Sequence, residues 1–402
     1  MGRGPIEIAE SFAEHLAVEA ADRDRDRAFP TGEIDAMRPT GLFALRVPRE
    51  AGGGGGSIAD YVRVVAALAT ADSSVAQMYI THTYGVELLN EAESDPNFRA
   101  EFYRRLVEEG LFIGNGHSER GTKTIFDFKT RLDERDDGSW VMNGKKFYGT
   151  GSGGADVLYI SGKVEGGGVD GSGDERRDLG EIRMVFLERD TPGLTIYNDW
   201  DGMGQRTTAS GTIELDNVLV PTARCLRTEG FDAPESLFSI VGQAGFAAVH
   251  TGVAEGAFAA GVDYVKTRSR PWPHAEVDEA SHDPYVISHI GRMRTEVSQA
   301  RAMLDRACAA IDEAERAPSA ERRALASVRA SEAKAVATEA ALDVSQRIFQ
   351  VAGAGATVAK YNLDRFWRDT RTLTVHDPVD YKYRLIGNWA LNGVDPPVTS
   401  YT

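Results

Sequence analysis

The sequence has little cysteine, no long apolar run and few lysines, and each shortage excludes a class of protein. Its two cysteines, Cys225 and Cys308, stand in no CxxC or Cys/His spacing, so they support neither a disulfide framework nor a zinc site. No stretch of about 18 or more apolar residues occurs, and the first residues hold no apolar run of the signal-peptide type. We therefore expect a cytoplasmic, soluble protein with no membrane partner.

Positive charge is also scarce. The formal net charge of -16 argues against a nucleic acid as partner, because phosphates would be repelled. Only nine of the basic residues are Lys, a bias that suits a salty cytoplasm or a GC-rich genome and so does not identify the habitat. The 402 residues, 42% of them hydrophobic, are enough for two or three domains with substantial cores.

Three regions of different periodicity follow one another along the chain. Residues 1–112 alternate helical segments with Gly/Pro breaks, and residues 113–228 hold short β-branched or aromatic segments separated by turn residues. From 229 to 402 the segments are long, Ala-rich and amphipathic, as in an antiparallel bundle. The fold expected is mainly α with a central β-domain: an N-terminal helical domain, a middle β-barrel-like domain and a C-terminal four-helix bundle.

Turn and cap residues set the expected bounds of the segments. Pro318 separates the last two long helices, and Ser319 is available to cap the second. The Gly-, Asp- and Ser-rich residues 166–180 are predicted to form a surface loop between two strands. Helices are expected over 6–21, 58–68, 73–90, 98–109, 239–267, 287–317 and 319–352, and strands over 124–132, 140–147, 157–164, 183–187 and 212–220.

The densest chemistry lies near the end, in RFWRDTRTLTVHDPVDYKYRLIGNWALN over 365–392. Asp377-Pro378 cannot lie within a helix, because Pro378 has no N–H and disfavours the α conformation at Asp377. His376 and Asp377 should therefore lie at a break between two helices, where side chains can point into a cavity. From residue types alone, a surface turn with a solvated His is the alternative.

No Walker motif, GxSxG, HExxH or GxGxxG after a strand is present. Other motifs carry a resemblance: PREAGGGGGS before the second helix of the first region, WVMNGKKFYGTGSGGADVLYISG as a central hairpin, GMGQR with SGTIELDNVLVP as a strand pair, and VAGAG followed by RFWRDTRT. Together they resemble the acyl-CoA dehydrogenase superfamily over nearly the whole chain.

Three further segments, NDWDGMGQR, TRSRPWPHAEVDEASHDPY and TVHDPVDYKYRLIGNWALNG, resemble the flavin-dependent monooxygenase branch, typified by dibenzothiophene and sulfone monooxygenases. The resemblance implies a two-component monooxygenase that takes reduced FMN from a separate flavin reductase. It would use O2 through a C4a-(hydro)peroxyflavin to oxygenate a small hydrophobic substrate, with sulfur and nitrogen among the candidate atoms. It also implies a homotetramer or homodimer.

The resemblance assigns roles to particular residues. His376 and Thr150 would face the flavin C4a, where they could hold peroxy oxygens or deliver a proton in a site kept dry. His82 and Tyr84 would lie on the substrate side, although two residues this close on a helix do not share a face, so at most one reaches the pocket. The remaining candidates are His117, Ser118 and Trp200 beside the flavin, Arg268, Arg270 and Arg371 for its phosphate, and Ser210 in the substrate pocket.

Two alternatives stay open. The dehydrogenases of the superfamily commonly carry a catalytic Glu in a YEG motif where this chain has His376-Asp377, so an FAD-dependent acyl-CoA dehydrogenase with Asp377 as base is the second hypothesis. A non-catalytic scaffold that binds flavin or a partner is the third. FAD also remains possible as the cofactor, because relatives build the adenosine site partly across a subunit interface.

Overall fold

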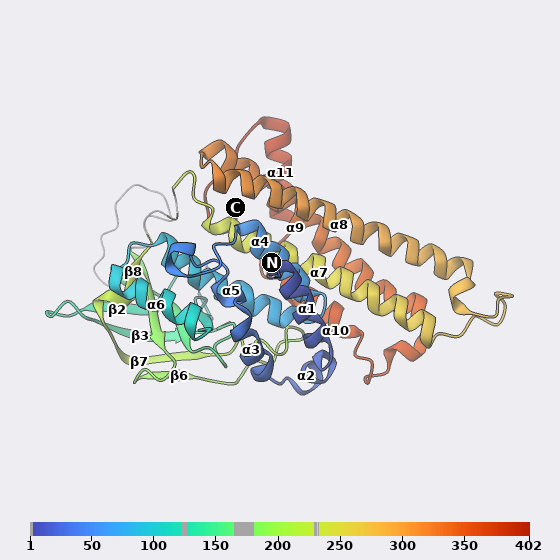
Figure 1. Ribbon diagram of the computed structural model, residues 1–402, viewed down its shortest axis with the longest axis horizontal. Helices are drawn as coiled ribbons and strands as arrows, with labels where there is room; N and C mark the ends of the chain where they lie inside the picture. The colour runs from blue at the N-terminus through green and yellow to red at the C-terminus, as the bar shows by residue number, and fades with distance from the viewer. Residues whose placement is uncertain (1–2, 123–126, 165–180, 229–230, 232) are drawn as a thin grey trace.

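The computed structural model describes residues 3–122, 127–164, 181–228, 231 and 233–402. A bundle of long helices lies on one side of the molecule and a curled sheet on the other, with α4 (Ile58–Ala69) and α5 (Ser73–Glu91) between them (Figure 1). One continuous cluster of buried apolar side chains joins helices of the first and third regions to the sheet of the second. Because this cluster crosses both expected boundaries, it does not divide the chain into separate cores, and the domain boundaries at 112/113 and 228/229 stay a prediction.

The N-terminal helices follow the expected segments with one correction. The single helix expected over 6–21 is wrong: α1 (Pro5–Ala17) ends early and α2 (Ala20–Asp26) begins anew. The break lets Arg23 donate to the carbonyl oxygen of Leu16 at 2.6 Å, which satisfies one of the free carbonyls at the end of α1. The other helices here are α3 (Thr31–Met37), α4, α5 and α6 (Pro96–Glu108).

The glycine run before α4 is tight rather than open. A Cβ on Gly53 would lie 2.3 Å from the carbonyl oxygen of Val47, so no larger residue fits there without a shift of the backbone. Gly54 donates its N–H to Ala44 at 2.9 Å. Ser57 then caps α4 by accepting from the N–H of Asp60 at 3.1 Å. The run positions the start of α4, which packs on α7.

The middle region forms one sheet of mixed direction. Its order is β6-β7-β3-β2-β4-β5-β8, with β1 paired in parallel to β4. β2 also pairs with β4 in parallel, over a short stretch. The remaining pairs are antiparallel. Of the strand expected over 124–132, residues 124–126 lie outside the described residues, and the described part forms a strand only from Arg131 onward. The loop expected over 166–180 also lies outside the described residues. The strands are β1 (Ile113–Gly116), β2 (Arg131–Glu134), β3 (Trp140–Lys146), β4 (Val157–Val164), β5 (Ile182–Glu188), β6 (Leu194–Ile196), β7 (Ile213–Val220) and β8 (Cys225–Arg227).

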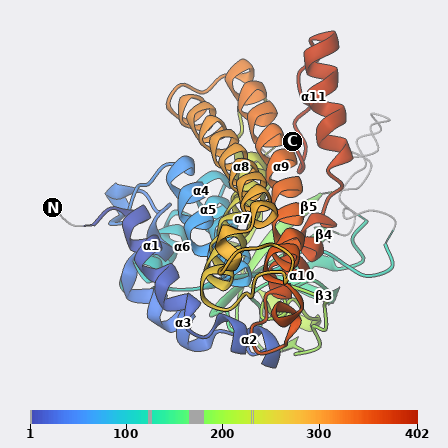
Figure 2. The same cartoon turned by 90° about the vertical axis from the view of Figure 1, so that its right-hand side faces the viewer.

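Three long helices, α7 (Phe238–Thr267), α8 (Pro284–Arg316) and α9 (Ala320–Ala352), form the body of the bundle. Two shorter helices, α10 (Asp364–Thr374) and α11 (Asp380–Asn392), pack on α9 and take the fourth position. Figures 1 and 2 show α11 projecting from one end of the bundle.

The expected helix cap and helix break of the bundle are confirmed. Ser319 accepts the N–H of Arg322 at 3.2 Å and caps α9, and Asp377-Pro378 lies in the break between α10 and α11. Among the described residues, no helix is long and apolar enough to span a membrane.

Candidate functional site

The first part of the candidate site is a pair of interlocked loops, 147–154 after β3 and 205–212 before β7. Gly149 donates its N–H to Gly211 at 3.1 Å, and Gly151 donates to Thr208 at 2.8 Å. Between them the hydroxyl of Thr150 lies 3.0 Å from that of Ser210, and both side chains are buried. The structure thus brings together two residues that the sequence assigned to the flavin and to the substrate.

Backbone strain gathers in the same two loops. Tyr148, Gln205 and Ala209 all have positive φ, at 61°, 51° and 47°. Such conformations cost about 1–3 kcal/mol each and persist only where the surroundings enforce them, most often at functional sites.

The second part of the site is the break between α10 and α11. The Nδ1 atom of His376 lies 3.4 Å from Oδ1 of Asp377, and its ring packs against Phe246 of α7 with centroids 4.7 Å apart. About half of the His376 side chain, 47%, is exposed. The surface turn with a freely solvated His therefore does not describe this residue, because one ring face and one ring nitrogen have partners.

Asp377 is the buried centre of this second part. Lys334 of α9 donates to its Oδ1, and Lys382 of α11 lies 3.3 Å from its Oδ2. Burial would raise the pKa of Asp377, but the hydrogen bond from His376 and the charges of Lys334 and Lys382 outweigh it and hold the pKa well below its usual range. Burial lowers the pKa of Lys334 to about 8.

The loop from Gly204 to Gln205 joins the two parts. Gly204 donates its N–H to Thr372 at 2.9 Å, and Gln205 donates its own to Asp369 at 2.6 Å, so the loop is fastened to α10 four to seven residues before His376. Asp369 also accepts from Ser73 of α5 at 2.8 Å. The positions of Thr150 and His376 are thus set by one hydrogen-bonded frame.

The segment after β1 forms a third side. Asn115 donates its N–H to the carbonyl oxygen of Thr150 at 3.2 Å. Burial, with the nearby charge of Lys146, lowers the pKa of His117 to about 3 against the opposing charge of Glu119. Ser118 accepts the N–H of Phe147 through its carbonyl oxygen at 2.8 Å, so it supports the loop that carries Thr150.

Trp200 lies beside this loop. Its indole N–H donates to the carbonyl oxygen of Gln205 at 2.8 Å, and its ring meets Tyr148 edge-on with centroids 6.0 Å apart. Trp200 therefore anchors the Gln205 turn.

The structure places His82 in the core between α5 and β1. His82 is 1% exposed, and both ring nitrogens are used by the backbone: Nδ1 accepts from Ile113 at 3.2 Å and Nε2 lies 2.8 Å from the carbonyl oxygen of Phe43. Burial lowers its pKa to about 4. His82 is a neutral core residue that fastens α5 to β1.

Tyr84 lies on another face of the same helix. Its ring meets Phe238 edge-on at 5.2 Å between centroids. Burial raises its pKa; its hydroxyl is hydrogen-bonded to the backbone of Gly242, and the charge of Asp377 acts on it. Tyr84 therefore points to α7 and His82 to β1, so the two do not share a face of α5.

The three arginines expected to bind phosphate lie in two places, two after α7 and one on α10. Arg268 and Arg270 are exposed and follow the end of α7, and Arg268 lies 5.2 Å over the ring of Tyr361. Arg268 is 22 residues beyond Phe246, about 33 Å along a helix that rises 1.5 Å per residue. Within one chain, Arg268 and Arg270 are therefore not assembled with Thr150 and His376. Arg371 of α10 is exposed and lies five residues before His376.

The residues present fit a planar, polar ring such as a flavin. Three buried side-chain oxygens in these loops, of Asn115, Gln205 and Thr207, have no hydrogen-bond partner among the described residues, and buried polar atoms are ordinarily paired. Hydroxyls, an imidazole and orphaned amide oxygens can orient such a ring and exchange a proton with it. These elements hold it in place without supplying redox chemistry themselves.

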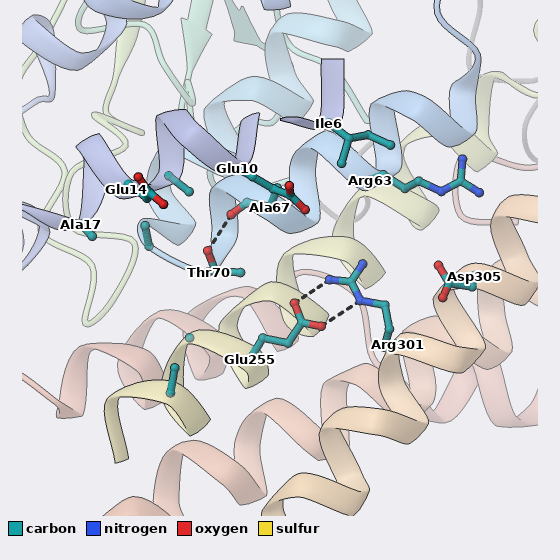
Figure 3. A pocket seen from close by; sticks show the side chains of 14 residues that line it. Ile6, Glu10, Glu14, Ala17, Arg63, Ala67, Thr70, Glu255, Arg301 and Asp305 are labelled. Atoms are coloured by element: carbon teal, nitrogen blue, oxygen red, sulfur yellow. Dashed lines mark hydrogen bonds and ion pairs between the residues drawn. The ribbon is translucent and has the colours of Figure 1, made fainter. Parts of the chain in front are cut away.

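A hollow of the described chain lies elsewhere, away from these loops. It measures about 680 Å³ and opens between α1, α4, α7 and α8, where Arg301 and Glu255 form a two-bonded ion pair (Figure 3). None of the predicted site residues lines it.

Sequence reasoning missed Lys334, Lys382 and Thr208. Lys334 follows Ala330 by four residues and precedes Ala337 and Ala341, so it stands on the apolar stripe of α9, and a charge on such a stripe was the available signal. Thr208 carried no comparable signal.

Comparisons with known proteins show the family of the chain. Family models for the N-terminal, middle and C-terminal domains of acyl-CoA dehydrogenase match residues 7–109, 118–218 and 244–381. Dibenzothiophene monooxygenase of Rhodococcus erythropolis is 33% identical over 98% of this chain and 94% of its own. The probable FMNH2-dependent monooxygenase SfnC of Pseudomonas putida is 32% identical over 100% and 98%.

A solved structure extends the likeness to three dimensions. TdsC from Paenibacillus sp. A11-2, in complex with FMN and indole, superposes with a TM-score of 0.88 at 31% identity, over 99% of this chain and 100% of that chain. The chain therefore belongs to the acyl-CoA dehydrogenase superfamily and, within it, to the flavin-dependent monooxygenases.

Proposed function

We propose that this protein is the oxygenase of a two-component system. It would bind reduced FMN delivered by a separate flavin reductase and, with O2, oxygenate a small hydrophobic substrate through a C4a-(hydro)peroxyflavin. The observation that carries the proposal is the state of His376: half-exposed, braced by Phe246 and hydrogen-bonded to a buried carboxylate. The FMN- and indole-bound relative supports the cofactor and the class of substrate.

The division of labour follows from the contacts. Nδ1 of His376 is directed to Asp377, and the other ring nitrogen, Nε2, has no recorded hydrogen bond to the described residues, so it could hold or move a proton at the reacting oxygen. The buried hydroxyls of Thr150 and Ser210 would hold the polar edge of the ring. Phe246 and the interlocked loops would exclude water, which matters because water access wastes reactive oxygen intermediates.

The dehydrogenase hypothesis loses its base in this arrangement. A general base must accept a proton near neutral pH. Asp377 is 7% exposed and its charge is balanced by Lys334 and Lys382, so its carboxylate is stable as the anion and is a poor proton acceptor. We propose that Asp377 orients His376 and holds its charge.

Arg268 and Arg270 would contact the flavin of a second copy of the chain. Because they lie at the far end of α7 from Phe246, they could meet the phosphate of a flavin only in a neighbouring subunit, in a homodimer or homotetramer built through the bundles. Arg371, on α10, is the candidate from the same chain.

Isotope incorporation tests the proposal. The protein would be supplied with FMN, NADH and a separate reductase under 18O2, with indole and dibenzothiophene as probes. We expect one labelled oxygen in the product, and loss of labelled product in His376→Ala but not in His282→Ala, an exposed histidine before α8. Products without the label, or bleaching of bound FAD by an acyl-CoA in the absence of a reductase, would refute it.

A further inference from the structure

The hydroxyl of Thr150 begins a chain of hydrogen bonds that runs inward to a carbonyl group. Thr150 Oγ1 lies 3.0 Å from Ser210 Oγ, and Ser210 Oγ lies 2.7 Å from Thr208 Oγ1. Thr208 Oγ1 in turn donates to the carbonyl oxygen of Gln205 at 2.9 Å. All three side chains are buried, with exposures of 7%, 3% and 0%.

The direction of this chain is determined at its inner end. Each hydroxyl carries one proton, whereas a carbonyl oxygen carries none, so Thr208 must donate to Gln205. Ser210 must then donate to Thr208, because the proton of Thr208 is already used. Thr150 must donate to Ser210 for the same reason. The only arrangement that makes all three bonds therefore directs the proton of Thr150 inward.

The acceptor at the end of the chain is itself held in place. The Gln205 carbonyl oxygen also receives the indole N–H of Trp200 at 2.8 Å, and the Gln205 N–H is bound by Asp369 at 2.6 Å. Gln205 and Ala209 both hold positive φ, a cost that the surrounding contacts must enforce. The loop therefore cannot turn its carbonyl away and reverse the chain without breaking several bonds.

With its proton committed, Thr150 offers only lone pairs to whatever lies against it. The N5 atom of a reduced flavin carries a hydrogen and donates, whereas N5 of an oxidised flavin has only a lone pair and needs a donor. We propose that N5 of the flavin lies against the Thr150 hydroxyl, and that Ser210 and Thr208 are positioning residues that fix Thr150 as a hydrogen-bond acceptor, so that the site prefers reduced FMN over oxidised FMN. The inference rests on the proposed function and deepens it.

The proposal narrows the roles expected at the site. Thr150 does not deliver a proton, which leaves that task to His376. A preference for the reduced form also suits an enzyme that receives reduced FMN from another protein and must release the oxidised form after each turnover.

The test compares the affinities of the two redox forms. Dissociation constants for oxidised FMN and, anaerobically, for reduced FMN would be measured by equilibrium dialysis. In Ser210→Ala, the Thr150 proton is free to turn towards N5, so we expect the ratio of oxidised to reduced dissociation constants to fall about tenfold, the worth of one hydrogen bond. Thr208→Val should lower the ratio in the same direction and provides a second variant if the first does not fold.

Two controls separate polarity from packing. Ser210→Thr keeps the hydroxyl and should keep the ratio. Ser152→Ala removes a hydroxyl that donates to Ala209 at 3.2 Å in the same loops but lies outside the chain, and should also keep it. General loosening of the loops would weaken both redox forms equally and leave the ratio unchanged.

The outcomes are distinct. A ratio that stays at the wild-type value in both Ser210→Ala and Thr208→Val, with FMN still bound, overturns the inference and leaves the proposed function intact. Failure of the wild-type protein to bind FMN in either form overturns both.

Discussion

Two buried lysine–carboxylate pairs of the described chain, one in the sheet and one in the bundle, invite comparison. In the sheet, Lys146 lies 2.7 Å from Glu119, with side chains 0% and 3% exposed. In the bundle, Lys334 pairs with Asp377, at 4% and 8%. Each lysine also lies over a phenylalanine ring, Phe128 or Phe246, and burial lowers the pKa of both lysines to about 8.

The difference lies in the remaining contacts of the carboxylate. Glu119 also accepts the backbone N–H groups of Lys129 and Thr130, at 2.8 and 3.0 Å, so both its oxygens are occupied by the fold. Asp377 instead shares Oδ1 with the imidazole of half-exposed His376. Burial and pairing are thus not themselves signs of function. What marks the bundle pair is its contact with a side chain that reaches solvent.

The largest expected loss of stability follows from breaking the Lys146–Glu119 pair in the sheet. Lys146→Met leaves Glu119 charged and buried without its partner, which typically costs about 3–5 kcal/mol. Urea denaturation at pH 7.5 would measure the free energy of unfolding. Adding Glu119→Gln to Lys146→Met should recover part of the loss while keeping acceptors for the two backbone N–H groups. A loss below about 1 kcal/mol in Lys146→Met would mean that water reaches this pair.

Asp377→Asn should come next, at about 3 kcal/mol near neutral pH, because it leaves two buried ammonium groups without a counter-charge. The folded-state pKa of Asp377 lies below its unfolded value, so its contribution is present above about pH 3.9 and is lost as pH falls through the folded value. Thermal unfolding at pH 7, 5 and 3 should show the gap between wild type and variant closing only below about pH 4. A gap that closes already at pH 6 would contradict the assigned direction of the shift.

Lys334→Met should cost less stability than Lys146→Met, about 1–3 kcal/mol, because Lys382 remains 3.3 Å from Asp377. It should, however, reduce oxygenation more than Lys146→Met does, measured per folded molecule with a saturating reductase. Equal activities in the two variants would mean that the Lys334–Asp377 pair stabilises the fold without a role in oxygenation, as expected for Lys146–Glu119.

The smallest expected losses of stability come from substituting the phenylalanine that lies over each lysine, and these two substitutions are the most closely matched. Phe246→Leu and Phe128→Leu each remove the ring over a buried lysine, and each should lower stability by about 1 kcal/mol. Phe246 also packs on His376, so only Phe246→Leu should change oxygenation. Peroxide released per NADH consumed would measure the uncoupling, and an equal rise in both variants would contradict a special role for Phe246.

The sequence predicted the parts of this account that rest on local rules. The Asp377-Pro378 break, the Ser319 cap and the succession of helical, strand and helical regions follow from proline geometry, capping and periodicity, and the structure confirms them. Resemblance supplied Thr150 and His376, whose roles remain proposals.

What the sequence could not predict depends on contacts between distant segments. His82 resembles any polar residue on a helix until Phe43 and Ile113, 39 and 31 residues away, occupy its two nitrogens. Lys382 lies in an exposed helix, yet its side chain alone is buried there. The direction of the Thr150 hydroxyl depends on a carbonyl 55 residues later in the chain.

We propose above all that His376 holds or moves a proton when reduced FMN reacts with O2. The most direct measurement loads the protein with FMN, reduces it anaerobically and mixes it with O2 in a stopped-flow spectrometer, following the near-ultraviolet band where C4a adducts of flavin absorb. The account predicts a transient species in the wild type that is lost or greatly shortened in His376→Ala and kept in His282→Ala. Reoxidation of the wild type in one featureless step, identical in His376→Ala, would contradict it.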